Sequence, residues 1–323
     1  MLQLALLVWI IILCVLYFLI PYLALPNANI WREGVLRVWI ISFSLYFSSI
    51  DLKYGFLALV VSLTLYEILH SKQLNNMVLP PSSDKNRDEI IHSLNNNETF
   101  SSQMIPPIII QTGPNKLDDK SFAYMDEMRR NNPDYQYMYF NDDDIDRFFK
   151  SNYPEYHNTY KRLPVFIQKI DFFRYLAVYH YGGFYFDTDI KILEPLDDKI
   201  RSHSVVFPVD EYIVGQLKDH FRYQPIVNTG LDFLLGQYAF ASIPKHPFLK
   251  LLIDTIHENI EMYISTATTA KDRELYVYRT TGPDFVTFMY ANYAYKNQLY
   301  ILTNGKRQYF GDYARHDFFG SWK

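Results

Sequence analysis

The chain has 323 residues, and its 35 acidic against 31 basic side chains give a net charge of -4. This balance argues against a nucleic-acid binder, because such proteins usually carry a strong basic excess. A hydrophobic fraction of 49% excludes a wholly disordered chain, and the single cysteine, Cys14, excludes an intramolecular disulfide framework and a cysteine-based zinc cluster.

Residues 1–70 predict a membrane anchor made of two or three apolar segments. Residues 2–25 carry no charge, and about 20 apolar residues are enough to span a bilayer. They also lack the basic flank and small-residue cleavage site of a secretory signal peptide. A second apolar stretch, residues 38–69, is interrupted by Asp51 and Lys53, so one tilted span and two short half-spans both remain open. We therefore expect N-terminal transmembrane helices, in a single-pass or multi-pass arrangement.

A change of composition marks the end of this anchor. Residues 71–103 are rich in asparagine and serine and contain the pair Pro80-Pro81, a composition typical of a flexible linker. From residue 104 onward, strand-like and helix-like patterns alternate. Residues 104–323 are therefore predicted to form one α/β domain.

The first elements of this domain follow from apolar runs and their boundaries. The run from Ile105 to Ile110 ends in Gln111-Thr112 and predicts a buried strand followed by a loop. Residues 119–131 predict a helix, and residues 135–140 alternate like a second strand. Asn141 and the acidic residues after it predict the capped start of a helix that reaches Lys150, although an acidic metal site is the alternative.

A third predicted helix carries a charged pair. Pro164 suits its first turn, and Gly182-Gly183 suits its end. Asp171 and Arg174 are three residues apart and so project from one helical face. They lie among apolar residues, where they can form a structural ion pair or line a polar ligand site. Their spacing leaves both interpretations open.

Two carboxylates interrupt the strand-like run that follows, residues 184–193. Asp187 and Asp189 share one face if this strand is regular. Like charges so close repel each other unless a cation lies between them, and Lys191 alone is insufficient to compensate both. Carboxylate oxygens are ligands that Mn²⁺ or Mg²⁺ accepts. The pattern therefore predicts a divalent-metal site.

These motifs together resemble glycosyltransferase family 32, the DXD-containing group that includes initiating α-1,6-mannosyltransferases and inositol-phosphorylceramide mannosyltransferases. The specific part is residues 167–175 followed by residues 181–189. Ile110 and Gly113 depart from the family, which usually has His and Trp at these positions. Weaker similarity extends over residues 132–135, 141–143, 236–241, 246–248, 281–283 and 316–322.

The resemblance implies a GT-A fold, which is an α/β/α sandwich that binds a nucleotide-sugar. It implies Mn²⁺ (or Mg²⁺) as the cofactor and retention as the stereochemical outcome. Asp187 and Asp189 would hold the ion, which would neutralise the negative charge that develops on the leaving diphosphate. Asp171 and Arg174 would hold the sugar or ribose of the donor, so these four residues are the predicted catalytic set.

Further site residues are predicted around this set. Gln111 and Thr112 end the first strand, where such folds bind the nucleotide. His316 would be a third metal ligand or a contact to the diphosphate. The resemblance adds Tyr185, Gln237 and Trp322 as substrate-binding residues, although Trp322 can equally be a packed terminal anchor.

The predicted function is a membrane-anchored glycosyltransferase of an endomembrane of the endoplasmic reticulum or Golgi type. It would move mannose, glucose or galactose from a nucleotide-sugar to a glycan or glycolipid acceptor. A membrane-tethered, non-catalytic sugar-nucleotide-binding protein is the first alternative. A phosphohydrolase of the HAD type is the second, but that motif requires Thr or Val where this chain has Lys191.

Overall fold

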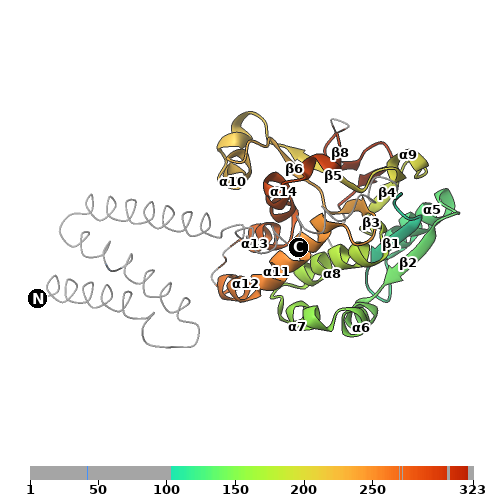
Figure 1. Ribbon diagram of the computed structural model, residues 1–323, viewed down its shortest axis with the longest axis horizontal. Coiled ribbons are helices and arrows are strands. Elements are labelled where there is room, and N and C mark those ends of the chain that lie inside the picture. Colours follow the sequence, from blue (N-terminus) through green and yellow to red (C-terminus); the bar gives the residue numbers. More distant parts are fainter. Residues whose placement is uncertain (1–41, 43–102, 269, 271, 304–305, 319–323) are drawn as a thin grey trace, which may run out of the picture. The chain divides into compact units, whose positions relative to one another are not determined.

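The computed structural model describes residues 42, 103–268, 270, 272–303 and 306–318 (Figure 1). The predicted anchor (1–70) and linker (71–103) therefore lie outside the described residues, apart from Ser42 and Gln103. Within the described ranges, no helix combines the length and the apolar character that crossing a membrane requires. The chain divides into two compact units, residues 1–77 with 265–271 and residues 78–264 with 272–323. The fold and site below belong to the second unit.

This unit is a mixed α/β structure with a central sheet, as the alternating sequence pattern predicted. The sheet has seven strands in the order β2-β1-β3-β7-β5-β6, with β8 paired to β5. Strands β1, β2 and β3 are mutually parallel, whereas β7 runs antiparallel to both β3 and β5. A second sheet of three antiparallel strands has the order β4-β10-β9. The strands are β1 (Ile108–Thr112), β2 (Gln136–Phe140), β3 (Gly183–Phe186), β4 (Ile190–Ile192), β5 (Val205–Tyr212), β6 (Phe233–Leu235), β7 (Ala239–Ser242), β8 (Leu299–Leu302), β9 (Tyr309–Phe310) and β10 (Ala314–His316).

Helices cover the sheet unequally on its two faces (Figure 1). Neighbouring residues Ile110 and Ile109 of β1 point to opposite faces and enter two separate hydrophobic cores. The Ile110 core is built with α6, α7, α8, α11 and α14, and the Ile109 core with α5, α9 and the small sheet. The helices are α5 (Asp119–Asn131), α6 (Asp142–Asn152), α7 (Pro154–Arg162), α8 (Phe166–Tyr181), α9 (Asp198–Arg201), α10 (Gln224–Val227), α11 (Pro247–Glu258), α12 (Ile260–Ala267), α13 (Arg273–Thr280) and α14 (Pro283–Asn292), with short 3-10 helices η3 (Gly215–Asp219) and η4 (Lys296–Gln298).

The acidic run after β2 serves as a helix cap. The Asn141 side chain accepts a hydrogen bond from the amide of Asp144, whose own carboxylate accepts one from the amide of Asn141. This reciprocal capping box satisfies donors that the first turn of a helix leaves open. The structure thus bears out the predicted cap at the start of α6.

Two predictions about the DXD region were wrong in detail. Pro164 lies before α8 rather than in its first turn, since the helix begins at Phe166. Residues 184–193 do not form one strand: β3 belongs to the large sheet and β4 to the small one. Residues 187–189 form a turn that connects the two sheets. The amide of Ile190 donates a hydrogen bond to the carbonyl of Asp187 across this turn, at 3.2 Å.

The glycine pair ahead of this turn lets β3 approach β1 closely. Gly182 and Gly183 have φ angles of +68° and +92°, a region that residues with a Cβ rarely adopt. A Cβ at Gly183 would lie 2.5 Å from the carbonyl oxygen of Ile108. Glycine at this position therefore allows the strand that leads into the DXD turn to lie at the centre of the sheet.

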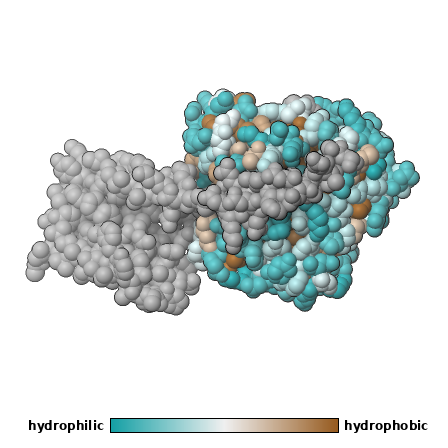
Figure 2. Space-filling model, viewed as in Figure 1, coloured by the Kyte–Doolittle hydropathy of each residue, from teal (hydrophilic) through white to brown (hydrophobic). Residues whose placement is uncertain are grey.

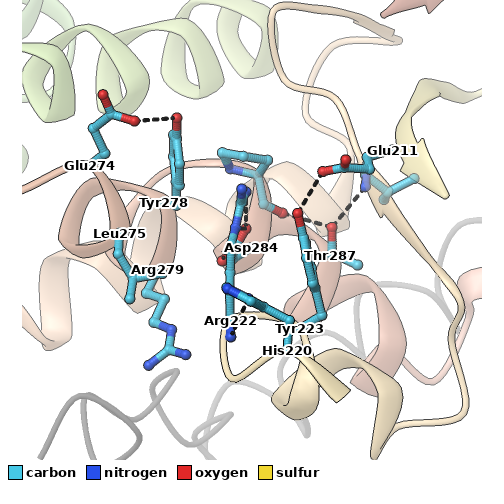
Figure 3. Close-up of polar contacts among 12 residues, drawn as sticks. Glu211, His220, Arg222, Tyr223, Glu274, Leu275, Tyr278, Arg279, Asp284 and Thr287 are labelled. Carbon is cyan, nitrogen blue, oxygen red and sulfur yellow. Dashed lines mark hydrogen bonds and ion pairs between the residues drawn. The ribbon is translucent and has the colours of Figure 1, made fainter. Parts of the chain in front are cut away.

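A polar cluster fastens the segment around η3 and α10 to α14 (Figure 3). The Arg222 guanidinium binds the buried carboxylate of Asp284, with Nη2 at 2.8 Å and Nε at 3.2 Å from its two oxygens. The same guanidinium lies over the ring of Tyr278, 4.3 Å from its centroid. Because bidentate arginine–carboxylate pairs are geometrically specific, this cluster fixes the position of the segment that follows β5.

The visible surface of the described part is mostly hydrophilic, with apolar residues scattered over it (Figure 2). Exposed large apolar side chains include Phe122, Phe166 and Val214, which come from different elements. Single apolar residues are common on protein surfaces. They carry no functional argument here.

Candidate active site

The DXD turn meets β10 of the small sheet. In that sheet, His316 of β10 lies opposite Ile190 of β4, directly after the turn that carries Asp187 and Asp189. One ligand atom from each of the three side chains lies within 4.8 Å of the other two. The nearest approach is 3.2 Å, between Nε2 of His316 and a carboxylate oxygen of Asp189. Sheet pairing, rather than the regular strand that we expected, brings this group together.

Aromatic rings and backbone hydrogen bonds fix His316. Its imidazole stacks on Tyr238, with the centroids 4.6 Å apart, and lies 3.8 Å from the ring of Phe318. The next amide, that of Asp317, donates to the carbonyl of Asp189 at 3.1 Å. Within the described residues, the buried Nδ1 of His316 has no hydrogen-bond partner. The nitrogen that faces Asp189 is Nε2, so Nε2 is the atom of the imidazole that a metal ion would use.

Arg174 joins the predicted helix pair to the DXD turn. Its Nη2 lies 3.4 Å from Asp171 and 3.1 Å from Asp187, and its Nη1 donates to the carbonyl of Gln237 at 3.0 Å. Asp171 and Arg174 do share one face of α8, and both are buried. The positive charge beside Asp187 is therefore Arg174. The amine of Lys191 instead lies 6.0 Å from the ring of Tyr124.

Burial shifts the charges of this network. It raises the pKa of Asp171 to about 6, although Arg174 and the hydroxyl of Thr281, which donates at 2.7 Å, act in the opposite direction. Burial also raises the pKa of Asp187, and Arg174 again opposes it. For Arg174, burial would lower the pKa, but the neighbouring Asp187 raises it above its usual range. The guanidinium thus stays charged and compensates the buried carboxylate of Asp171 and the partly exposed carboxylate of Asp187.

The predicted nucleotide-binding residues also reach Asp187. Gln111 donates from Nε2 to the Asp187 carbonyl at 3.1 Å, and the Tyr185 hydroxyl donates to its carboxylate at 2.8 Å. Because the Tyr185 proton is used there, the Thr112 hydroxyl donates to Tyr185 at 2.9 Å. The ends of β1 and β3 therefore support the DXD turn through side chains that the sequence had singled out.

Gln237 and Trp322 are the other two residues predicted to bind substrate. The side chain of Gln237 accepts a hydrogen bond from the Tyr175 hydroxyl at 3.0 Å, which keeps it beside Arg174. Trp322 lies outside the described residues, so its substrate-binding role stays a prediction.

Sequence reasoning missed Tyr137 and Tyr238. The Tyr137 hydroxyl donates to the side-chain oxygen of Gln111, and the guanidinium of Arg129 lies 3.9 Å from the centroid of its ring. In the pairing of β1 with β2, Tyr137 lies opposite Ile109, which points to the same face as Gln111, so this contact follows from the strand register and not from the sequence. Tyr238 gave no sequence signal either, because its partner His316 is far away in the sequence.

The three convergent side chains fit a divalent ion. Two carboxylates and one imidazole are suitable donors for Mn²⁺, and oxygen ligands also suit Mg²⁺. With metal–ligand bonds of about 2.1 Å, opposite ligands of an octahedral ion lie about 4.2 Å apart. The spacing within 4.8 Å between the ligand atoms of Asp187, Asp189 and His316 is of this order.

Comparisons with known proteins agree with this chemistry. A family model described as "Glycosyltransferase sugar-binding region containing DXD motif" matches residues 118–207. "Inositol phosphoceramide mannosyltransferase 1" of Schizosaccharomyces pombe is 27% identical over 195 residues, which are 59% of this chain and 53% of the relative. "Initiation-specific alpha-1,6-mannosyltransferase" of the same organism is 24% identical over 287 residues, covering 73% of this chain and 69% of the relative.

The similarity is partial in two respects. The chain spans 50–59% of the length of the first curated relatives that it matches. A solved structure, "PaToxG Glycosyltransferase", covers 64% of this chain and 77% of its own, with a TM-score of 0.40 and 15% identity. That structural likeness is too weak to carry an argument.

Proposed function

We propose that this chain, whose residues 118–207 match the model of a DXD-containing sugar-binding region, is a glycosyltransferase of family 32 that transfers a hexose from a nucleotide-sugar to a glycan or glycolipid acceptor. Mannose is the hexose we favour, because relatives are named as mannosyltransferases. The observation that carries the proposal is the convergence of Asp187, Asp189 and His316. We assign the central sheet and its two covering layers to the GT-A type.

The proposed metal ligands are Asp187, Asp189 and His316, with Mn²⁺ as the preferred ion. A bound divalent ion supplies positive charge for the diphosphate leaving group. Gln111, Tyr185 and Arg174 orient Asp187 through the contacts described above, so the carboxylate is fixed before substrate arrives. Such preorganisation is a main source of transition-state stabilisation. We include retention of the sugar configuration in the proposal on family resemblance alone.

Asp171 acts in this proposal as a positioning residue. Its carboxylate is fully buried and is held by Thr281 and Arg174, so it supports the guanidinium rather than touching the donor. Arg174 itself reaches both carboxylates from α8 and neutralises part of their charge. The pair thus combines the structural and the functional interpretations that its spacing left open.

Donor turnover by the full-length protein is expected to need a divalent ion. The test incubates purified protein with GDP-mannose, UDP-glucose or UDP-galactose and Mn²⁺, and measures nucleotide release with vesicles containing inositol phosphoceramide and without them. We expect release from at least one donor and its loss when EDTA is added. Tight donor binding without any release would favour the non-catalytic binding protein, and full activity in EDTA would contradict the metal-dependent mechanism.

We also propose that residues 1–70 anchor the protein in an endomembrane of the endoplasmic reticulum or Golgi type. Residues 2–25 are charge-free and long enough to span a bilayer. The full-length protein is then expected in the membrane pellet after carbonate extraction. Complete release into the soluble fraction would contradict the anchor while leaving the proposed transferase activity untouched.

A further inference from the structure

A β-bulge in β5 lies close to the candidate site. In the pairing of β5 with β6, Val209 lies opposite Leu235 and Glu211 opposite Leu234, so Asp210 is the extra residue. Bulges leave such a residue outside the ladder and change the direction of its side chain. Bulges are also over-represented next to active sites. The direction of the Asp210 side chain is thus set by an irregularity of the strand.

Asp210 and its neighbour Glu211 have very different surroundings. The Glu211 carboxylate accepts a hydrogen bond from the Tyr223 hydroxyl at 2.8 Å (Figure 3) and lies 3.4 Å from Nη2 of Arg307. In the part of the chain that the structure describes, the side chain of Asp210 has neither a hydrogen bond nor an ion pair. It is only partly exposed, and this burial raises its pKa to about 6, with the charge of Arg307 opposing the shift.

The backbone ties Asp210 to the proposed metal ligand. The carbonyl of Asp210 accepts from the amide of Gln308 at 3.3 Å, and the carbonyl of Gln308 accepts from the amide of His316 at 2.9 Å. Tyr238 stacks on His316. Burial raises the pKa of Tyr238, and the neighbouring carboxylate of Asp210 raises it further. Asp210 therefore borders the Asp187–Asp189–His316 group without belonging to it.

A carboxylate in this setting needs a donor. A partly buried charged group without a hydrogen-bond partner costs free energy. The neighbouring Glu211, in contrast, has such a partner in the hydroxyl of Tyr223. Asp210 lies outside the group of side chains whose ligand atoms are within 4.8 Å of one another, so a hydroxyl donor fits it better than the cation does. The hydroxyl groups of a hexose are donors of the required kind, and hydrogen bonds to an ionised acceptor are strong.

We propose that the Asp210 carboxylate accepts a hydrogen bond from a hydroxyl group of the donor's hexose. This inference rests on the proposed function, because that function places a hexosyl diphosphate at the neighbouring metal ligands. It adds a residue that would recognise the sugar rather than the diphosphate. Loss of Asp210 should therefore affect binding of the nucleotide-sugar and leave binding of the free nucleotide unchanged.

The test compares wild-type protein with Asp210→Asn by calorimetry in the presence of Mn²⁺. The ligands are whichever of GDP-mannose, UDP-glucose and UDP-galactose the wild type binds most tightly, and the corresponding GDP or UDP. We expect the nucleotide-sugar to bind about 10–100-fold more weakly to Asp210→Asn, the loss typical of a charged hydrogen bond. Asp219→Asn, the same change at an exposed position of η3, is the control and should change neither affinity.

Melting temperatures separate a binding role from a structural one. Asp210→Asn removes a poorly compensated charge and should leave the melting temperature unchanged or raise it. Equal weakening of sugar-nucleotide and free nucleotide, or no change in either, would overturn the inference, as would a marked loss of stability. A wild type that binds none of the nucleotide-sugars would instead refute the proposed function.

Discussion

Asp189→Asn is expected to lower the rate of sugar transfer by about 10²–10³-fold, the usual effect of removing one group aimed at developing charge. The substitution keeps the shape of the side chain and removes one negative ligand of the proposed ion. A carboxylate oxygen of Asp189 also lies 3.2 Å from Nε2 of His316. The substitution therefore alters the surroundings of a second proposed ligand, His316. Initial rates with saturating donor and Mn²⁺ would measure the loss.

Asp143→Asn is the matched control for this experiment. Asp143 belongs to the acidic run that caps α6 and is exposed, and the run was the alternative metal site at the level of the sequence. Its change should leave both the rate and the Mn²⁺ affinity intact. Direct titration of Mn²⁺ by electron paramagnetic resonance gives a readout independent of activity. An Asp189→Asn protein that binds Mn²⁺ and turns over like the wild type would contradict the assignment of the ligands.

Arg174→Ala is expected to reduce the free energy of unfolding by about 3–5 kcal/mol, the cost typical of breaking a buried ion pair. The guanidinium is buried and compensates both Asp171 and Asp187. Its removal leaves two carboxylates in a setting that already disfavours their charged forms. Denaturant unfolding in EDTA would measure the effect without a contribution from bound metal.

Two further variants test this explanation. Arg162→Ala breaks an exposed pair with Glu261 and should change stability little, because such pairs contribute little. Adding Asp187→Asn to Arg174→Ala should recover part of the lost stability, because one of the uncompensated charges is then absent. If Arg174→Ala kept its stability but lost turnover, the guanidinium would be a direct donor contact and the ion-pair explanation would be wrong.

The sequence predicted local features of the fold well. Residues 119–131 form the expected helix α5, and the cap at Asn141 and the glycines before the DXD turn are where they were placed. These features depend on hydrogen bonds and backbone conformations within a few residues. The contact between Asp171 and Arg174 was predictable for the same reason, since three residues along a helix return to one face.

The missed features depend on pairing between distant segments. Asp187 and Asp189 lie in a turn between two sheets because β4 pairs with β10. No local sequence pattern predicts this pairing. The contact of Arg174 with Asp187 joins α8 to the end of β3, and the bulge at Asp210 depends on the register with β6. Register of this kind is set by tertiary packing. The sequence therefore named Asp187, Asp189 and Arg174 without giving their partners, and it did not single out Asp210.

An ion bound by Asp187, Asp189 and His316 would act as a reversible cross-link between β4 and β10 of the small sheet. Asp187 and Asp189 precede β4 and His316 ends β10, so one ion would join two chain segments that are far apart in the sequence. Joining distant segments restricts an opened chain more than joining near ones, and a ligand that binds only the folded state adds to stability. Local opening of β10 from β4 should then be the motion most sensitive to chelation. Hydrogen exchange at the backbone amides of β10 should accelerate first when Mn²⁺ is withdrawn.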